Sequence, residues 1–241
     1  MKRKVRISAY ILTLFILLCS FFGCAVTEDG DDTKPSRKHD VLPIASASSE
    51  PTASPQRTPL MLISKSTTVD GCTVNYPFVC DSELELLNVA ILAAFSELAS
   101  YCESPGSSIT YTTQFNRNGL LSFLLTCSSA DGRELAVDAA NFDCISCRRV
   151  FLSACFGSSP DYAAKLSELV SREVAAAGAS VLSSPPPMDD SRPFYFTFGG
   201  LCLVYRDLEL TSRDPAVLRV SAPLEELAGV IAPDGLLNRL K

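Results

Sequence analysis

The sequence has a single histidine, His39, and no tryptophan. His39 lies in a stretch rich in proline, serine and charged residues, where a solvated linker residue is the expected role. The part of the chain expected to fold therefore has no imidazole, which argues against Ser-His-Asp and Cys-His catalysis and against zinc sites with histidine ligands. The formal net charge is −6, and no Lys/Arg cluster follows the first six residues, so nucleic-acid binding is not expected.

Other residue patterns that would indicate catalysis are also lacking. The adjacent carboxylates Asp189-Asp190 and Glu225-Glu226 are typical of a solvated loop or helix face. Gly199-Gly200 is not followed by Lys-Ser or Lys-Thr, so it is not a phosphate-binding loop. We therefore expect a protein that is not an enzyme and that needs neither cofactor nor metal. A hydrolase built on carboxylates and water alone stays an open alternative that no residue pattern favours.

The first thirty residues predict export from the cytoplasm. Four basic residues at positions 2, 3, 4 and 6 precede an apolar run from Ile7 to Phe22, and an acidic stretch follows at 28–32. The run ends at Gly23-Cys24, the pattern of a lipoprotein signal in which the new N-terminal cysteine carries the lipid. We expect a signal peptide at 1–23 and lipid on Cys24. An uncleaved signal anchor is the alternative, and both place the rest of the chain on the outer face of the cell membrane.

Residues 24–68 predict a disordered linker. Five prolines lie among many serines and threonines, with no apolar periodicity until residues 60–63. Such a segment cannot bury enough surface to offset the entropy lost on ordering. The folded domain is expected at 69–241.

The sequence of this domain predicts an α+β fold, in which two main helices pack on an antiparallel sheet. The first helix is expected to begin at Ser82, with Glu85 completing a capping box, and the second at Pro160. Asn118-Gly119, Asp131-Gly132 and Gly199-Gly200 predict turns between strands. The expected strands are 73–79, 109–115, 120–127, 134–142, 194–198, 201–205 and 217–221, and a short helix is expected at 223–229.

The order of these elements resembles one family, the extracytoplasmic domain of RsiV-type anti-sigma factors, which also occurs in some membrane-anchored peptidoglycan deacetylases. The likeness covers about residues 70 to 230. It lies in the opening strand 74–77, the turn 118–122, the segments 141–143 and 151–156, the hairpin 194–205 and the closing segment 220–227.

The resemblance implies a domain that binds lysozyme outside the cell. Two loops depart from the family: residues 128–131 replace a loop that usually contains glycine and histidine, and residues 206–210 replace an aromatic segment. We therefore transfer no binding residues from the family.

Ten cysteines are present, of which Cys19 lies in the signal. The eight expected in the domain allow 105 disulfide connectivities, and the sequence does not choose among them. Cys102 and Cys127 lie on apolar faces, where reduced cysteine behaves as a small core residue. Cys144-Ile145-Ser146-Cys147 also permits a local disulfide, thiol redox chemistry or half of a zinc site. The resemblance puts this motif across a turn, and no second CxxC is present.

These observations lead to two functional hypotheses. The first is a cell-envelope lipoprotein whose domain binds a protein, such as lysozyme, or a cell-wall ligand outside the membrane. The alternative is an extracytoplasmic thiol-disulfide protein that uses Cys144 and Cys147.

Overall fold

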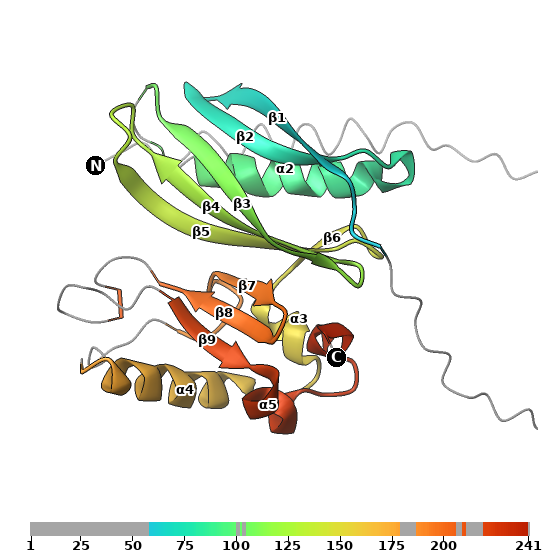
Figure 1. Ribbon diagram of the computed structural model, residues 1–241, viewed down its shortest axis with the longest axis vertical. Coiled ribbons are helices and arrows are strands. Elements are labelled where there is room, and N and C mark those ends of the chain that lie inside the picture. The colour runs from blue at the N-terminus through green and yellow to red at the C-terminus, as the bar shows by residue number, and fades with distance from the viewer. Residues whose placement is uncertain are drawn as a thin grey trace, which may run out of the picture. The chain divides into compact units, whose positions relative to one another are not determined.

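The structure of the protein is a computed structural model (Figure 1). It describes residues 58–99, 102, 105–178, 187–205, 209–210 and 219–240. All described residues lie in one compact unit, Ala53–Lys241. The predicted signal, Cys24 and His39 therefore lie outside the described residues. In the part of the chain that is described, no helix is long and apolar enough to cross a membrane.

A six-stranded sheet occupies the first half of the folded unit, in the order β1-β2-β3-β4-β5-β6. All neighbours are antiparallel except β2 and β3, which run parallel with Thr73 opposite Ser108. The expectation of an antiparallel sheet is wrong at this pair, because α2 connects the two strands and returns the chain to the same end. The strands are β1 Leu62–Val69, β2 Cys72–Val79, β3 Ser108–Arg117, β4 Leu120–Ser128, β5 Glu134–Asp143 and β6 Arg148–Val150.

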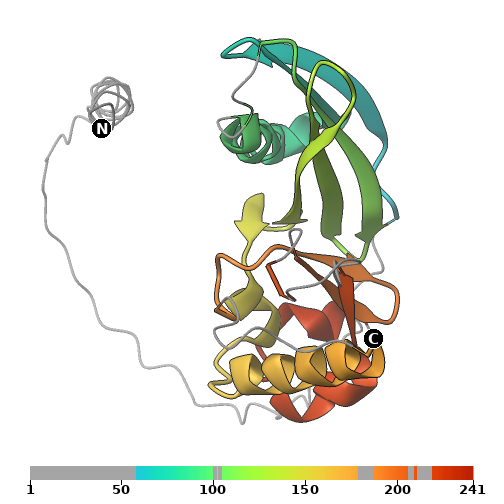
Figure 2. The ribbon, with the colours of Figure 1, turned by 90° about the vertical axis from the view of Figure 1, so that its left-hand side faces the viewer.

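Helix α2 (Glu85–Ala99) covers one face of this sheet (Figure 2). A single 3₁₀ turn, η2 (Ser82–Leu84), precedes it, and the Asp81 carboxylate caps that turn by accepting from Glu83 N–H at 3.0 Å. The prediction of Ser82 as the N-cap residue is therefore wrong by one position, because Asp81 is the cap. Leu87, Ile91, Phe95 and Leu98 recur at helical spacing and are buried against the sheet.

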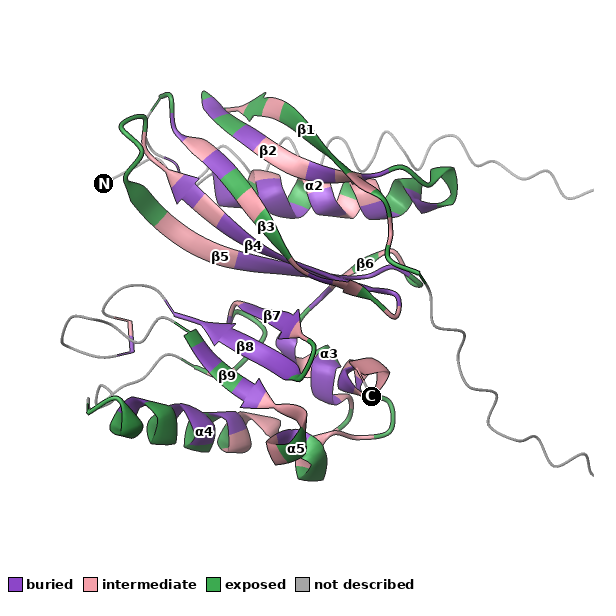
Figure 3. Ribbon diagram, viewed as in Figure 1, coloured by how far each residue is buried: buried purple, intermediate pink, exposed green. Residues whose placement is uncertain are grey.

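A second, three-stranded antiparallel sheet has the order β7-β8-β9. The single predicted sheet is thus two sheets. The strands are β7 Phe194–Thr197, β8 Gly200–Val204 and β9 Arg219–Pro223, and the helices of this half are α3 Leu152–Phe156, α4 Tyr162–Ala176 and α5 Leu224–Leu227, with 3₁₀ turns η3 Ala228–Val230 and η4 Leu236–Leu240. The apolar stripe of α4 packs into the same core as β7 and β8, and its other side is exposed (Figure 3).

Several elements depart from the predicted boundaries. Strand β1 begins at Leu62, inside the segment expected to be linker, and pairs along its whole length with β2. Strand β6, helix α3 and the turn η4 were not predicted. The Asn118-Gly119 turn is confirmed, since both residues have positive φ, 53° and 72°.

The two sheets pack against each other through apolar side chains. Phe115 of β3 contacts Phe196 of β7, and a second, small cluster adds to this contact. Leu124 and Ala139 of the large sheet meet Tyr195, Cys202 and Val204 of the small one. Residues alternate along β5, so Ala140 and Phe142 face α2 while Ala139 points to the other face. This packing places β5 beside β7, and residues of both strands line the pocket described below.

Candidate functional site

A buried polar bridge joins the two sheets beside the apolar cluster. The Ser122 hydroxyl donates to the Asn141 side-chain oxygen and accepts from Phe196 N–H at 2.8 Å. The Asn141 amide donates to the Phe194 carbonyl at 2.6 Å. These side chains therefore satisfy backbone groups of β7 that its three-stranded sheet leaves without a partner.

A pocket of about 470 Å³ opens next to this bridge. Helix α2, strands β5, β6 and β7, the segment 187–193 and Glu209 all contribute to its wall. One part of the wall is apolar and consists of Ala139, Val150, Phe151, Pro187, Pro193 and Phe194. The volume lies within the range usual for small-molecule sites.

Six charged residues form the rest of the wall, together with Asn141 and Ser191. Four are acidic and two basic: Glu97, Asp138, Asp190, Glu209, Arg149 and Arg192. Arg149 pairs with Glu97 at 2.6 Å, and Arg192 pairs with Glu209 at 3.0 Å. Each guanidinium of the wall is thus neutralised locally, and the formal charge of the lining is negative.

Arg192 is the most buried of the six, with a side chain 4 % exposed. Its guanidinium carbon lies 4.6 Å from the centre of the Tyr205 ring, and it also donates to the Val204 carbonyl at 3.3 Å. Its Nε is buried and finds no hydrogen-bond partner among the described residues. Leaving a buried donor without an acceptor costs roughly 1–3 kcal/mol.

Asp190 is held in place by the start of α3. One of its oxygens accepts from Ser153 N–H at 2.8 Å. Burial, and secondarily the negative charge of Asp190, raise the pKa of Cys155 well above its ordinary value. Burial and the charges of Asp190 and Asp189 likewise raise the pKa of Tyr162. The charge of Asp190 thus contributes to both shifts, after burial.

The motif Cys144–Cys147 lies in the turn between β5 and β6. Cys147 has φ +54°, and its thiol lies 3.7 Å from the Cys144 carbonyl oxygen. The two sulfurs are not bonded to each other. A turn offers no helix N-terminus to stabilise a thiolate, which is the feature that lowers a thiol pKa in thioredoxin-like motifs.

The Asp143 carboxylate organises this turn. It accepts from Ile145 N–H at 3.0 Å, from the Ser146 hydroxyl at 2.8 Å and from Arg239 at 2.7 Å. Burial alone would raise the pKa of Asp143, but these donors, led by Arg239, hold the pKa below its ordinary value. These hydrogen bonds give Asp143 a structural role in the turn. Within the described residues, no group of His, Cys, Asp and Glu side chains is arranged to bind a metal ion.

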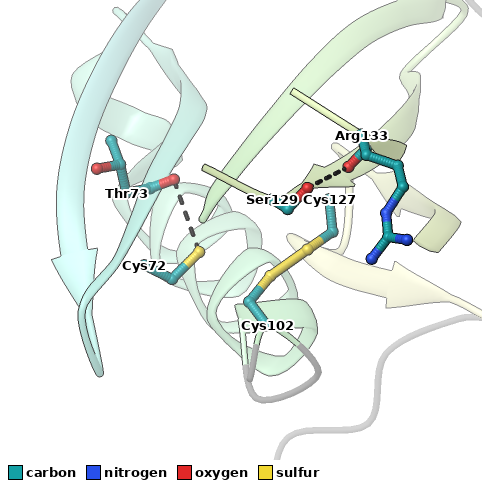
Figure 4. Close-up of a disulfide and its surroundings, with 6 residues drawn as sticks. All are labelled: Cys72, Thr73, Cys102, Cys127, Ser129 and Arg133. Carbon is teal, nitrogen blue, oxygen red and sulfur yellow. Dashed lines mark hydrogen bonds between the residues drawn. A yellow bond between two sulfur atoms is a disulfide. The ribbon is translucent and has the colours of Figure 1, made fainter. Parts of the chain in front are cut away.

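One disulfide is present among the described cysteines, between Cys102 after α2 and Cys127 on β4 (Figure 4). Cys72 lies beside it in the same core, with its thiol directed at the Thr73 carbonyl (Figure 4). Burial raises the pKa of the Cys72 thiol, so it stays protonated and behaves as a core residue.

No residue pattern in the sequence predicts the pocket. Asp190 had been interpreted as part of a solvated pair, and Arg149, Arg192 and Glu97 carried no recognisable motif. The pocket unites residues separated by up to 112 positions, from Glu97 to Glu209, and only the packing of the two sheets brings them together. Cys24 lies outside the described residues, and Cys144 and Cys147 do not line the pocket.

Comparisons with known proteins identify the fold. No protein-family model and no curated protein matches the chain. Among solved structures, a DUF3298 family protein from Pseudomonas aeruginosa is similar with a TM-score of 0.52 and 15% identity, covering 73% of this chain and 96% of that one. A member of the DUF3298 family from Bacteroides fragilis has a TM-score of 0.49 and 13% identity, covering 76% of this chain and 96% of that one. The chain therefore has a fold similar to that of a DUF3298 protein.

Proposed function

We propose that the protein is a cell-envelope lipoprotein, anchored by lipid on Cys24, whose α+β domain binds a ligand outside the membrane. The pocket between the two sheets carries this proposal. It has the size of a ligand site and is lined by charged side chains from five separate parts of the chain. RsiV-like domains are related to the DUF3298 family, and this relation supports the resemblance from which the extracytoplasmic binding role is drawn.

The ligand is a protein or a fragment of the cell wall, and lysozyme is the protein that the resemblance names. The test is retention of the full-length chain, solubilised in detergent, on immobilised lysozyme and on muramidase-digested wall material. Ser191 is exposed and lines the pocket, so Ser191→Trp fills the opening without disturbing the core. Ser171 on the exposed side of α4 does not line it, so Ser171→Trp is the matched control.

Retention of the wild type and of Ser171→Trp, with loss for Ser191→Trp, is the expected result. Equal retention of both variants would show that the ligand site lies elsewhere. The anchor is tested separately by incorporation of labelled palmitate, which we expect for the wild type and not for Cys24→Ser. Label in Cys24→Ser would contradict lipid attachment at this residue.

The thiol-disulfide alternative has no observation of the structure in its favour. Its motif lies in a turn held by Asp143, apart from the pocket, and offers no helix N-terminus.

A further inference from the structure

Strand β1 forms one edge of the six-stranded sheet, and no strand of the described residues pairs with its outer side (Figure 1). It is eight residues long and pairs with β2 over its whole length. The edge of a sheet presents unpaired N–H and C=O groups that a further strand can bond. The outer side of β1 therefore has the groups that a partner strand requires.

The hairpin between β1 and β2 determines which residues face outward. Both residues of its turn, 70–71, have positive φ, so Val69 and Cys72 form a hydrogen-bonded pair. Such pairs alternate along the hairpin, and the bond from Cys80 N–H to the Met61 carbonyl, 3.2 Å long, agrees with this alternation. The backbone groups of the residues in between point away from β2 and form the free edge: Leu62, Ser64, Ser66 and Thr68.

The other sheet edges among the described residues are protected, and β1 is not. Strand β6 has three residues, β9 ends in Pro223, and the Ser122 and Asn141 side chains bond the outer groups of β7. Natural sheets protect long edges with lysine, proline or bulges. Strand β1 has no proline and no bulge, and its one charged residue, Lys65, lies 3.2 Å from the centre of the Phe78 ring on β2. Its free edge is thus typical of a strand that pairs with a partner.

The described residues that precede β1 do not cover the free edge. The Asn116 side chain on β3 donates to the Leu60 carbonyl at 2.8 Å and accepts from Leu60 N–H at 2.9 Å. Strand β3 lies on the other side of β2 from the free edge, so these bonds direct the chain away from it. The described part of the chain therefore offers no strand for this edge.

A second copy of β1 has matching side chains. In an antiparallel pair with a two-fold axis at Ser66, each β1 residue lies opposite a β1 residue of the other copy. Ile63, which is 45% exposed, then lies opposite Val69, so apolar side chains meet. Lys65 lies opposite Thr67, so no like charges meet. The sequence of β1 is therefore complementary to itself in this register.

We propose that the chain forms a two-fold symmetric dimer in which the two β1 strands pair antiparallel about Ser66 and join the two six-stranded sheets into one. No residue of β1 lines the pocket, so each copy keeps its own pocket. The dimer therefore does not depend on the proposed function.

The test is the oligomeric state of the full-length chain, solubilised in detergent, by sedimentation at micromolar protein concentration. We expect a dimer for the wild type. Ser66→Lys places two ammonium groups opposite each other at the axis and leaves the β1–β2 bonds intact, so it should weaken the dimer at least about tenfold. Thr110→Lys, at an exposed position of β3, is the matched control and should leave the dimer unchanged.

A monomeric wild type would overturn the inference, whether or not a peptide from another protein then binds the free edge. An equal effect of the two lysine variants would overturn it as well, since added charge alone would be the cause. Far-UV circular dichroism checks that both variants fold.

Cysteine cross-linking locates the contact with a smaller substitution, and so tests it even if Ser66→Lys does not fold. The background is Cys80→Ala, which removes an exposed thiol. Ser66→Cys brings two thiols together at the axis, and a short bis-maleimide should link the two chains. Ser64→Cys lies opposite Thr68 of the second copy and should be linked at least about tenfold more slowly. Equal rates would contradict pairing about Ser66, and no link in a folded Ser66→Cys would contradict an interface at β1.

Discussion

At the scale of single residues, Asp143 has the clearest electrostatic role. It is 8% exposed, and its oxygens accept from Arg239, Ser146 and Ile145 N–H. A carboxylate whose pKa is lowered by folding stabilises the native state above its unfolded pKa, and this contribution is lost as the pH falls through the folded pKa. The unfolded pKa is about 4, so the loss belongs to the range below about pH 4.

We expect Asp143→Asn to lower the free energy of unfolding at pH 7 by about 1–3 kcal/mol, because it removes the charge that Arg239 faces. We also expect a smaller loss of stability below about pH 4 than in the wild type, since the titrating group is gone. Urea denaturation at a series of pH values measures both effects. Asp161→Asn, at an exposed position without a side-chain cap bond, is the control and should change stability by less than about 0.5 kcal/mol. A pH profile of Asp143→Asn that runs parallel to that of the wild type would contradict the assignment.

The cysteines of the β5–β6 turn are expected to be dispensable for ligand binding. Cys144 is buried and Cys147 half-buried, and neither lines the pocket. The Cys144→Ser/Cys147→Ser variant should keep retention on the ligand within about twofold and lose some stability, because the buried thiol at 144 becomes a hydroxyl. Retention assays and thermal unfolding measure the two separately. Loss of retention in a variant that still folds would restore the thiol hypothesis.

At the scale of elements, the hairpin β7–β8 shows both what the sequence predicts and what it does not. Gly199-Gly200 correctly predicted a hairpin, but the turn is formed by Phe198 and Gly199, and Gly200 already belongs to β8. Gly200 has φ +153°, and a Cβ there would overlap the Ala222 carbonyl of the neighbouring strand β9. The requirement for glycine at position 200 comes from the close approach of strand β9. The residues around Gly200 in the sequence do not indicate that β9 lies there.

This difference between the two glycines predicts different effects of the same change. Gly200→Ala should cost more than about 3 kcal/mol or prevent folding, because β9 must move away. Gly199→Ala is the matched control, since its Cβ would meet no atom within 4 Å, and it should change stability by less than about 1 kcal/mol. Urea denaturation of both variants tests the prediction, and equal losses would show that the β8–β9 contact is not the cause.

Another element-scale prediction concerns the bridge between the sheets. Ser122→Ala leaves Phe196 N–H and the Asn141 oxygen without their partner, and should cost about 2–4 kcal/mol for the two buried groups. Ser64 on the exposed side of β1 is the control, and Ser64→Ala should be nearly neutral. Because Asn141 lines the pocket, ligand retention should weaken together with stability in Ser122→Ala. Full stability of this variant would show that the bridge does not join the two sheets.

At the scale of the whole molecule, the sequence correctly predicted the α+β fold class and most of the helices and strands. It did not predict how the strands are arranged in sheets. Alternation and turn residues located β2 to β5 and β7 to β9 because these signals are local. The parallel β2–β3 pair, the division into two sheets and strand β1 depend on contacts between distant segments. The polar segment of β1 has little apolar alternation and is ordered by eight paired positions with β2, so no composition rule could separate it from the linker.

The disulfide connects the stability of the whole domain to the compartment where the protein acts. Cys102 and Cys127 are 25 residues apart in the sequence. Closing a loop of this length lowers the entropy of the unfolded chain, which stabilises the folded state by about 3 kcal/mol. Such bonds persist outside the cytoplasm and are reduced within it, so a domain that depends on this bond fits the proposed envelope location. We expect thiol reductant to lower the melting temperature of the wild type and to leave that of Cys102→Ala/Cys127→Ala unchanged. Cys80→Ala, at an exposed cysteine outside any disulfide, should respond to reductant as the wild type does. A wild-type melting temperature that reductant does not move would mean that the packing of α2 against β4 stabilises this end of the sheet without the bond.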